Sequence, residues 1–225
     1  MIDAILPTAG KATRMRGLPK FLLPAGPEYL TLIERHITEL LEHCETVWIP
    51  TRPEQTILLE SLRLSSDRVV VVPMTTSTMT ETVLRISAIS AAERFLMVMP
   101  DTYFAGEKPY SYLAASTYEM SLATWKIRTD QLGKLGQVKL AETPEGLVTH
   151  SEDKNVLCTY PHSWGAMAFR KRVLSFGNAE MPHTGYLLPG LLEAGIEIHA
   201  REMNGSYFDC GTPAEYVEML TSGLD

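Results

Sequence analysis

The chain has 225 residues and a formal net charge of −7, with 45% hydrophobic and 21% charged residues. This balance excludes a disordered chain and a broad basic surface for nucleic acid, and no apolar run approaches the ~20 residues of a membrane span. The three cysteines are far apart, which indicates neither a disulfide framework nor a zinc site. We therefore expect a cytoplasmic protein with no nucleic-acid or membrane partner. The sequence leaves open whether it forms a homo-oligomer.

Short β-rich runs alternate with amphipathic stretches in the first half of the chain. Strands are expected at 2–6, 46–50, 68–73 and 95–100. Helices are expected within 30–44, 54–62 and 80–93. This alternation predicts an α/β fold in which a mainly parallel sheet carries helices on both faces.

After residue 118 the rhythm changes to shorter strand-like pieces, which indicates antiparallel pairing. These strands are expected near 119–127, 135–142, 146–150 and 163–169. A helix near 184–194, a strand near 196–203 and a helix from Pro213 close the chain. We predict one continuous mixed sheet within a single domain, residues 1–225, with halves 1–118 and 119–225.

The first strand leads into a loop of small residues and cations. Ala9, Gly10 and Ala12 carry little side-chain bulk, so backbone N–H groups can approach an anion there. The first 20 residues hold four cations against one carboxylate, and Arg14 and Lys20 are expected to neutralise phosphate oxygens. An ordinary surface loop is the alternative. The loop is neither a P-loop nor a Gly-x-Gly-x-x-Gly fingerprint, so a nucleotide site here must have another design.

Two carboxylates, Asp101 and Asp209, each follow a predicted strand. Asp101 follows the strand 95–100, and ligands of open α/β sheets bind at that edge, so Asp101 is a candidate for holding Mg²⁺ against a phosphate. The alternative role for Asp101 is to cap a turn or a helix. Asp209 precedes a Thr212-Pro213 helix start and needs a partner if it is buried, which a cation shared with Asp101 would supply.

Three segments share their order and spacing with one family. Thr8 to Met15 with Pro19-Lys20 is similar to its small-Ala-Gly-x-Gly-Thr-Arg-Met/Leu and Pro-Lys signature, and Tyr207 to Pro213 is similar to its aromatic-x-Asp-x-Gly-Thr-Pro signature. Asp101 resembles its metal-binding aspartate. The chain therefore resembles the nucleotidyltransferases that act on sugar 1-phosphates, the family that includes glucose-1-phosphate thymidylyltransferase. Weaker matches are Leu135 to Val138, Glu152 to Lys154 and Gly165 to Phe169.

The resemblance implies a Rossmann-like fold of the nucleotide-diphospho-sugar transferase type, with a nucleotide-binding first half and an acceptor-binding second half. It implies transfer of NMP from an NTP to a phosphorylated small molecule, a sugar 1-phosphate, with Mg²⁺ as cofactor and pyrophosphate as product. Arg14 and Lys20 would be catalytic, and Asp101 and Asp209 would hold the metal. The implied nucleotide contacts are Thr8, Ala9, Gly10, Lys11, Ala12, Thr13, Thr80 and Glu81. The implied acceptor contacts are Gly136, Asp153, Lys154 and Gly165.

The chain also departs from the family pattern. Ala12 and Thr78 stand where glycines are usual, and Trp164 stands where a smaller Asn or Thr is usual. These departures leave open a cytidylyltransferase acting on a non-sugar phosphate or phosphonate such as phosphocholine. A catalytically silent regulatory homologue is a further alternative, although the expected cations and carboxylates are present. A glycosyltransferase would be expected to show an Asp-x-Asp pair, which Asp101-Thr102-Tyr103 lacks.

Overall fold

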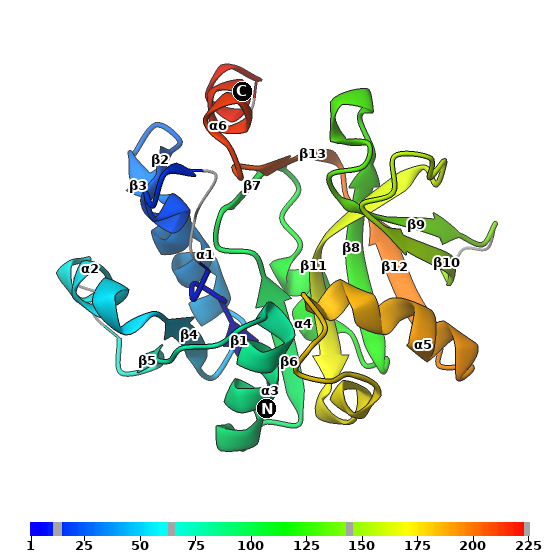
Figure 1. The fold of residues 1–225 in the computed structure, drawn as a ribbon, viewed down its shortest axis with the longest axis horizontal. Helices are drawn as coiled ribbons and strands as arrows, with labels where there is room; N and C mark the ends of the chain where they lie inside the picture. The colour runs from blue at the N-terminus through cyan, green and yellow to red at the C-terminus, as the bar shows by residue number, and fades with distance from the viewer. Residues whose placement is uncertain (11–14, 63–65, 143–145, 223–225) are drawn as a thin grey trace.

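A computed structural model describes residues 1–10, 15–62, 66–142 and 146–222, and its centre is one large mixed sheet (Figure 1). In the described chain nine strands form this sheet, in the order β10-β9-β11-β6-β1-β4-β5, with β8 on β11 and β12 on β8. The strands are β1 (Asp3–Ile5), β4 (Val47–Thr51), β5 (Val69–Pro73), β6 (Arg94–Val98), β8 (Met120–Lys126), β9 (Gly136–Leu140), β10 (Val148–Asp153), β11 (His162–Arg170) and β12 (Ile198–Glu202).

The strand directions confirm the predicted sheet. β6, β1, β4 and β5 pair in parallel, and β12 pairs in parallel with β8. β11 runs against β6, β8 and β9, and β10 runs against β9. All strands of this sheet except β10 and β11 therefore point the same way. The antiparallel strand β11 joins the two predicted halves of the chain into one sheet.

Helices cover both faces of the sheet, as the sequence pattern predicts. They are α1 (Leu32–Leu41), α2 (Thr56–Ser61), α3 (Met79–Ile89), α4 (Tyr110–Ala115), α5 (Leu187–Glu193) and α6 (Pro213–Ser222). Side chains alternate along β6: Leu96 and Val98 pack in the core under α1, α2 and α4, whereas Phe95 and Met97 pack in the core under α3 and α5. This two-residue alternation is what a strand between two helix layers requires.

Local signals set where the helices begin. At α1 the Thr31 hydroxyl accepts from the Glu34 N–H at 3.3 Å, and the Glu34 carboxylate accepts from the Thr31 N–H at 2.9 Å, a capping box. At α6 the Thr212 hydroxyl accepts from the Glu215 N–H at 3.3 Å, which confirms the predicted cap. The stretch predicted as one helix at 54–62 is instead a 3₁₀ turn at Pro53–Gln55 followed by the short α2.

The sequence prediction missed two small sheets and the helix α4. β2 (Pro24–Ala25) pairs with β3 (Leu30–Thr31), and β13 (Gly205–Asp209) pairs antiparallel with β7 (Thr102–Gly106). β7 begins directly after Asp101, and Asp209 lies opposite Thr102 in the register. The two carboxylates singled out in the sequence are therefore brought to neighbouring backbone positions by a sheet that sequence analysis did not predict. No helix in the described part of the chain is long and apolar enough to cross a membrane.

Candidate active site

A cavity, called the larger cavity below, lies at the carboxyl ends of the parallel strands. It has a volume of about 450 Å³. Its walls are the turn after β1 (Pro7 to Gly10), Pro19 to Phe21, Gln55, the start of α3, Met99 to Asp101 after β6, and Pro182. Ligands of open α/β sheets bind at this edge, and the volume lies within the usual range for small-molecule sites.

Lys20 and Asp101 form an ion pair in this cavity. Lys20 Nζ lies 2.8 Å from Asp101 Oδ2, and the side chains are 16% and 14% exposed. Lys20 is held by a 3₁₀ turn at Lys20–Leu22, whose Phe21 is buried in the core. The sequence predicts that Lys20 binds phosphate and that Asp101 binds the metal. The two side chains lie side by side, although they are 81 residues apart in sequence.

The predicted nucleotide contacts divide into three groups. Thr8, Ala9 and Gly10 line the larger cavity, and the Thr8 hydroxyl donates to the Pro50 carbonyl at 2.9 Å, which ties the end of β1 to β4. The predicted contacts Lys11, Ala12, Thr13 and the predicted catalytic Arg14 lie outside the described residues. Thr80 and Glu81 form the third group.

Thr80 and Glu81 are placed differently from the other predicted contacts. Thr80 is fully buried, and the Glu81 carboxylate accepts from the Ser77 N–H at 2.7 Å at the start of α3. The described residues of this segment that do line the cavity run from Thr76 to Met79 and include Thr82. Thr78, where a glycine is usual in the family, caps α3 by accepting from the Glu81 N–H at 3.0 Å.

A smaller cavity of about 90 Å³ adjoins the larger one, because Met79 and Met99 line both. All four predicted acceptor contacts line it: Gly136, Asp153, Lys154 and Gly165. Asp209 lines it as well, together with Lys134, Leu135, Trp164, His183 and Tyr207. Residues from β9, β10, β11 and β13 thus meet in one place, and their acceptor role stays a prediction.

Backbone geometry brings Asp153 and Lys154 into the same cavity. Consecutive residues of a strand point to opposite faces, and Asp153 ends β10. Lys154 has a φ of 51°, in the left-handed region that residues other than glycine seldom adopt. This turn breaks the alternation, so the carboxylate and the following cation both line the cavity.

The two predicted glycines make room for aromatic rings. A β-carbon on Gly136 would lie 2.3 Å from Trp164 Nε1, and one on Gly165 would lie 2.4 Å from Tyr207 Cε2. Gly165 is also where β11 bulges against β8, between Trp164 and Ala166. Both glycines therefore have a packing role in addition to lining the cavity.

Asp209 and Asp101 lie in one electrostatic environment. The Cys210 N–H donates to the Asp101 carbonyl at 2.9 Å. Burial, followed by the charges of Asp101 and Asp209, raises the pKa of the Cys210 thiol, and burial and the same two carboxylates raise the pKa of Tyr207 well above its ordinary value. The thiolate form of Cys210 is therefore disfavoured, which argues against Cys210 as a nucleophile.

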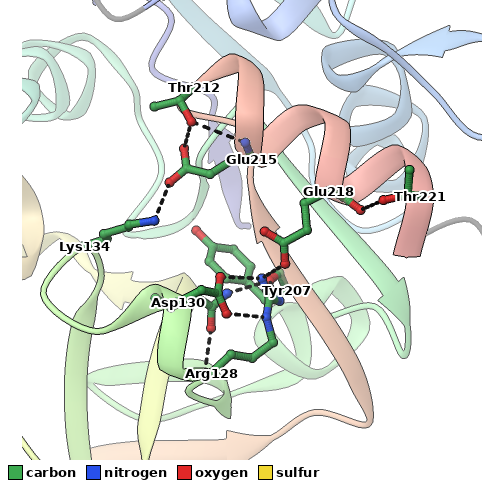
Figure 2. Close-up of polar contacts among 9 residues, drawn as sticks. Arg128, Asp130, Lys134, Tyr207, Thr212, Glu215, Glu218 and Thr221 are labelled. Atoms are coloured by element: carbon green, nitrogen blue, oxygen red, sulfur yellow. Dashed lines mark hydrogen bonds and ion pairs between the residues drawn. The ribbon is translucent and has the colours of Figure 1, made fainter.

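An ion-pair network fastens the segment between β8 and β9 to β13 and α6 (Figure 2). Arg128 pairs with Glu218 at 2.7 Å and with Asp130 at 3.1 Å, and it donates to the Tyr207 carbonyl at 3.1 Å. Lys134 lies 3.6 Å from Glu215 and also lines the smaller cavity. The network holds in place the strand that carries Asp209.

Sequence reasoning missed two side chains of the smaller cavity, Lys134 and His183. Lys134 directly precedes the Leu135-Gly136 match, so its nearness to a recognised motif was a usable signal. His183 lies in a stretch with no motif, and its place in the cavity comes from the tertiary fold alone.

Several solved structures with the same fold are named as nucleotidyltransferases. A protein named as a glucose-1-phosphate thymidylyltransferase from Bacillus anthracis superposes with a TM-score of 0.85 at 14% identity, covering 100% of this chain and 96% of its own. A UDP-glucose pyrophosphorylase complexed with UDP-glucose gives 0.81 at 18% identity, covering 99% and 98%. An inositol-1-phosphate CTP transferase from T. maritima gives 0.77 at 15% identity, covering 99% and 97%. The fold is thus that of nucleotide-diphospho-sugar transferases.

The sequence itself matches the model of the MobA-like NTP transferase domain over residues 4–157. This match spans more than half of the chain, and the chain therefore belongs to that family. No curated protein matches the chain. The predicted resemblance to sugar-phosphate nucleotidyltransferases is confirmed.

Proposed function

We propose that this protein transfers NMP from an NTP to a sugar 1-phosphate and releases pyrophosphate. The observation that carries the proposal is the pair of adjoining cavities. One contains the Lys20–Asp101 ion pair, and the other contains Lys154 and Asp209. A donor nucleotide and a phosphorylated acceptor need two such neighbouring sites with cations in each, and solved proteins of this fold include one complexed with UDP-glucose.

In the proposed reaction the acceptor's phosphate oxygen attacks the α-phosphorus in line. A protein nucleophile is not needed, because the phosphate is already anionic and catalysis consists of positioning and charge neutralisation. Lys20 neutralises the α-phosphate, and Lys154 holds the acceptor phosphate. Arg14 is proposed, from the family resemblance, to bind the β- and γ-phosphates and the leaving pyrophosphate.

Asp101 and Asp209 are proposed to hold Mg²⁺. Their donor set fits this ion because it consists of carboxylate oxygens, which a hard cation prefers. The described residues contain no group of three or more His, Cys, Asp or Glu side chains arranged for a metal. Phosphate oxygens and water would then complete the coordination, as is usual for Mg²⁺. When bound, the ion would neutralise phosphate charge that develops during transfer.

The proposal is tested by pyrophosphate release with each of ATP, CTP, GTP, UTP and dTTP, combined with glucose 1-phosphate or phosphocholine, with Mg²⁺ and with EDTA. Mg²⁺-dependent release with glucose 1-phosphate is expected. Asp209→Asn should lower turnover by ~10²-fold or more, because an oriented charge in such a site contributes ~3 kcal/mol. The matched control is Asp67→Asn, which alters an exposed carboxylate.

A second candidate function is a cytidylyltransferase for a non-sugar phosphate such as phosphocholine. One observation favours it. Trp164 packs against Gly136 and narrows the smaller cavity, whose volume of about 90 Å³ favours a small acceptor. Release of pyrophosphate with CTP and phosphocholine, and not with glucose 1-phosphate, would establish this candidate in place of the first. No release with any pair, from a folded protein, would favour a catalytically silent homologue.

A further inference from the structure

His183 and Asp153 form a hydrogen-bonded pair in the smaller cavity. His183 Nε2 lies 3.0 Å from Asp153 Oδ2, and the side chains are 12% and 11% exposed. The other ring nitrogen, Nδ1, accepts from the Gly185 N–H at 3.1 Å, which makes His183 the cap of the 3₁₀ turn at Thr184–Tyr186. Because Nδ1 accepts, the ring proton lies on Nε2, which donates to Asp153.

Aromatic packing holds the imidazole in this orientation. The ring lies edge-on to Tyr186 with centroids 4.8 Å apart, and its centroid is 6.3 Å from that of Trp164. A β-carbon on Gly185 would lie 2.9 Å from His183 Nδ1 and 2.4 Å from Trp164 Cζ2. The ring is therefore confined on several sides, which suits a side chain that positions another.

The second oxygen of Asp153 faces Gly136. A β-carbon there would lie 3.1 Å from Asp153 Oδ1, so this oxygen sits over the glycine that lines the cavity floor. Among the hydrogen bonds of the described residues, Asp153 uses only Oδ2, toward His183. Oδ1 thus lies beside Gly136 in the cavity that Lys154 also lines, where the proposed function places the acceptor phosphate.

We propose that His183 is a positioning residue for acceptor recognition: its Nε2–H holds the Asp153 carboxylate so that Oδ1 accepts a hydrogen bond from an O–H or N–H donor of the phosphorylated acceptor. This inference rests on the proposed function. A site built to hydrogen-bond a substrate group discriminates strongly against an analogue that lacks it, because its own polar atom is then left unpaired. The substrate class is therefore a phosphate ester with a hydroxyl or protonated amine close to the phosphate.

The kinetic test uses pairs of acceptors that differ in one hydrogen-bond donor group. One pair is glucose 1-phosphate and 2-deoxyglucose 1-phosphate, and the other is phosphoethanolamine and phosphocholine. The protein should prefer the member of each pair that has the hydrogen-bond donor. His183→Ala should raise the acceptor KM by ~10-fold, the effect of losing one charge-assisted hydrogen bond, and should reduce the preference, with the NTP KM unchanged. His183→Gln, which keeps an N–H donor, should restore most of the acceptor affinity and most of the preference.

His162 provides the matched control. Its Nε2 lies 2.8 Å from Glu202 Oε2 and its side chain is 13% exposed, so it makes a similar histidine–carboxylate pair, but it is not among the described residues that line either cavity. His162→Ala should leave unchanged both the acceptor KM and the preference for acceptors that carry the hydrogen-bond donor. A His183→Ala protein that transfers NMP with an unchanged acceptor KM would overturn this inference alone, whereas no transfer by the unaltered protein with any pair would overturn the proposed function and this inference with it.

A spectroscopic test requires no activity. The nitrogen-15 spectrum of the histidine rings should show His183 with its proton on Nε2 at neutral pH, and addition of glucose 1-phosphate should shift the His183 signals and not those of His162. A proton on Nδ1 would contradict the Gly185 contact and overturn the inference, as would equal shifts at both histidines.

Discussion

Replacing Lys20 by methionine tests the charge arrangement at the centre of the site. Methionine keeps most of the aliphatic length of lysine, so the variant removes the ammonium charge with little change in packing. Lys20 Nζ lies 2.8 Å from Asp101 Oδ2 at the edge of the larger cavity. We expect the variant to bind NTP more weakly and to transfer NMP much more slowly.

The magnitude follows from the burial of the pair. A unit charge ~4 Å from a phosphate charge contributes about 4 kcal/mol at an effective dielectric constant of ~20. Lys20 is 16% exposed, so solvent screens it only in part. Taking about 3 kcal/mol as the loss, kcat/KM should fall by ~10²-fold. Most of the loss should appear in kcat, because negative charge on the phosphates is redistributed in the transition state.

The assay is pyrophosphate release with the NTP and acceptor that the screen identifies, with thermal unfolding to verify that each variant is folded. Lys126→Met is the matched control, since Lys126 also pairs with a carboxylate, Glu202 at 3.6 Å, but is 79% exposed. Lys20→Arg should recover part of the activity because it keeps the charge without the compact ammonium group. A folded Lys20→Met protein with kcat/KM within threefold of the unaltered protein would refute the reasoning.

Three further outcomes are expected. Arg128→Ala removes the pair with Glu218 at 2.7 Å and should lower the free energy of unfolding by about 1 kcal/mol, seen by calorimetry as a fall in Tm of ~2–4 °C; an unchanged Tm would contradict it. Burial lowers the pKa of His36 to about 4, below its unfolded value of 6.5, so the unfolded chain binds this proton first and the free energy of unfolding falls by about 3 kcal/mol as the pH drops from 6.5 toward 4. Urea unfolding across this range should show a flatter pH dependence for His36→Gln, and equal slopes would count against the assignment. Gly165→Ala places a β-carbon 2.4 Å from Tyr207 and should destabilise the fold by about 1–3 kcal/mol and raise the acceptor KM, whereas wild-type stability would show that the ring can move.

The regular elements were predictable where a hydrophobic period was long enough. The strand at 95–100 and the helix within 30–44 appear as β6 and α1, because a short continuous apolar run and an apolar repeat at three- and four-residue steps are local properties of the sequence. β7 and β13 were not predicted, because each strand is stabilised by the other, about 100 residues away, and neither has a strong pattern of its own. Short strands that depend on a distant partner leave little trace in sequence.

The site shows the same division. The roles proposed for Lys20, Asp101 and Lys154 come from motifs, and the structure places these residues along two adjoining cavities. Thr80 and Glu81 were chosen by the same reasoning, yet Thr80 is buried and Glu81 stabilises the start of α3. Sequence position alone does not separate a residue that lines a cavity from its neighbour one step around a helix.

The sequence by itself determined the α/β class, the family resemblance and the chemistry of the side chains, because hydrophobic periodicity and short motifs are carried by residues close together in the chain. Only the tertiary structure decided which of these side chains meet. The β7–β13 pairing sets Asp209 beside Thr102, the left-handed turn at Lys154 directs two consecutive residues into one cavity, and His183 reaches Asp153 across 30 residues. Each of these contacts depends on strand register and on packing between distant segments, which no local pattern encodes.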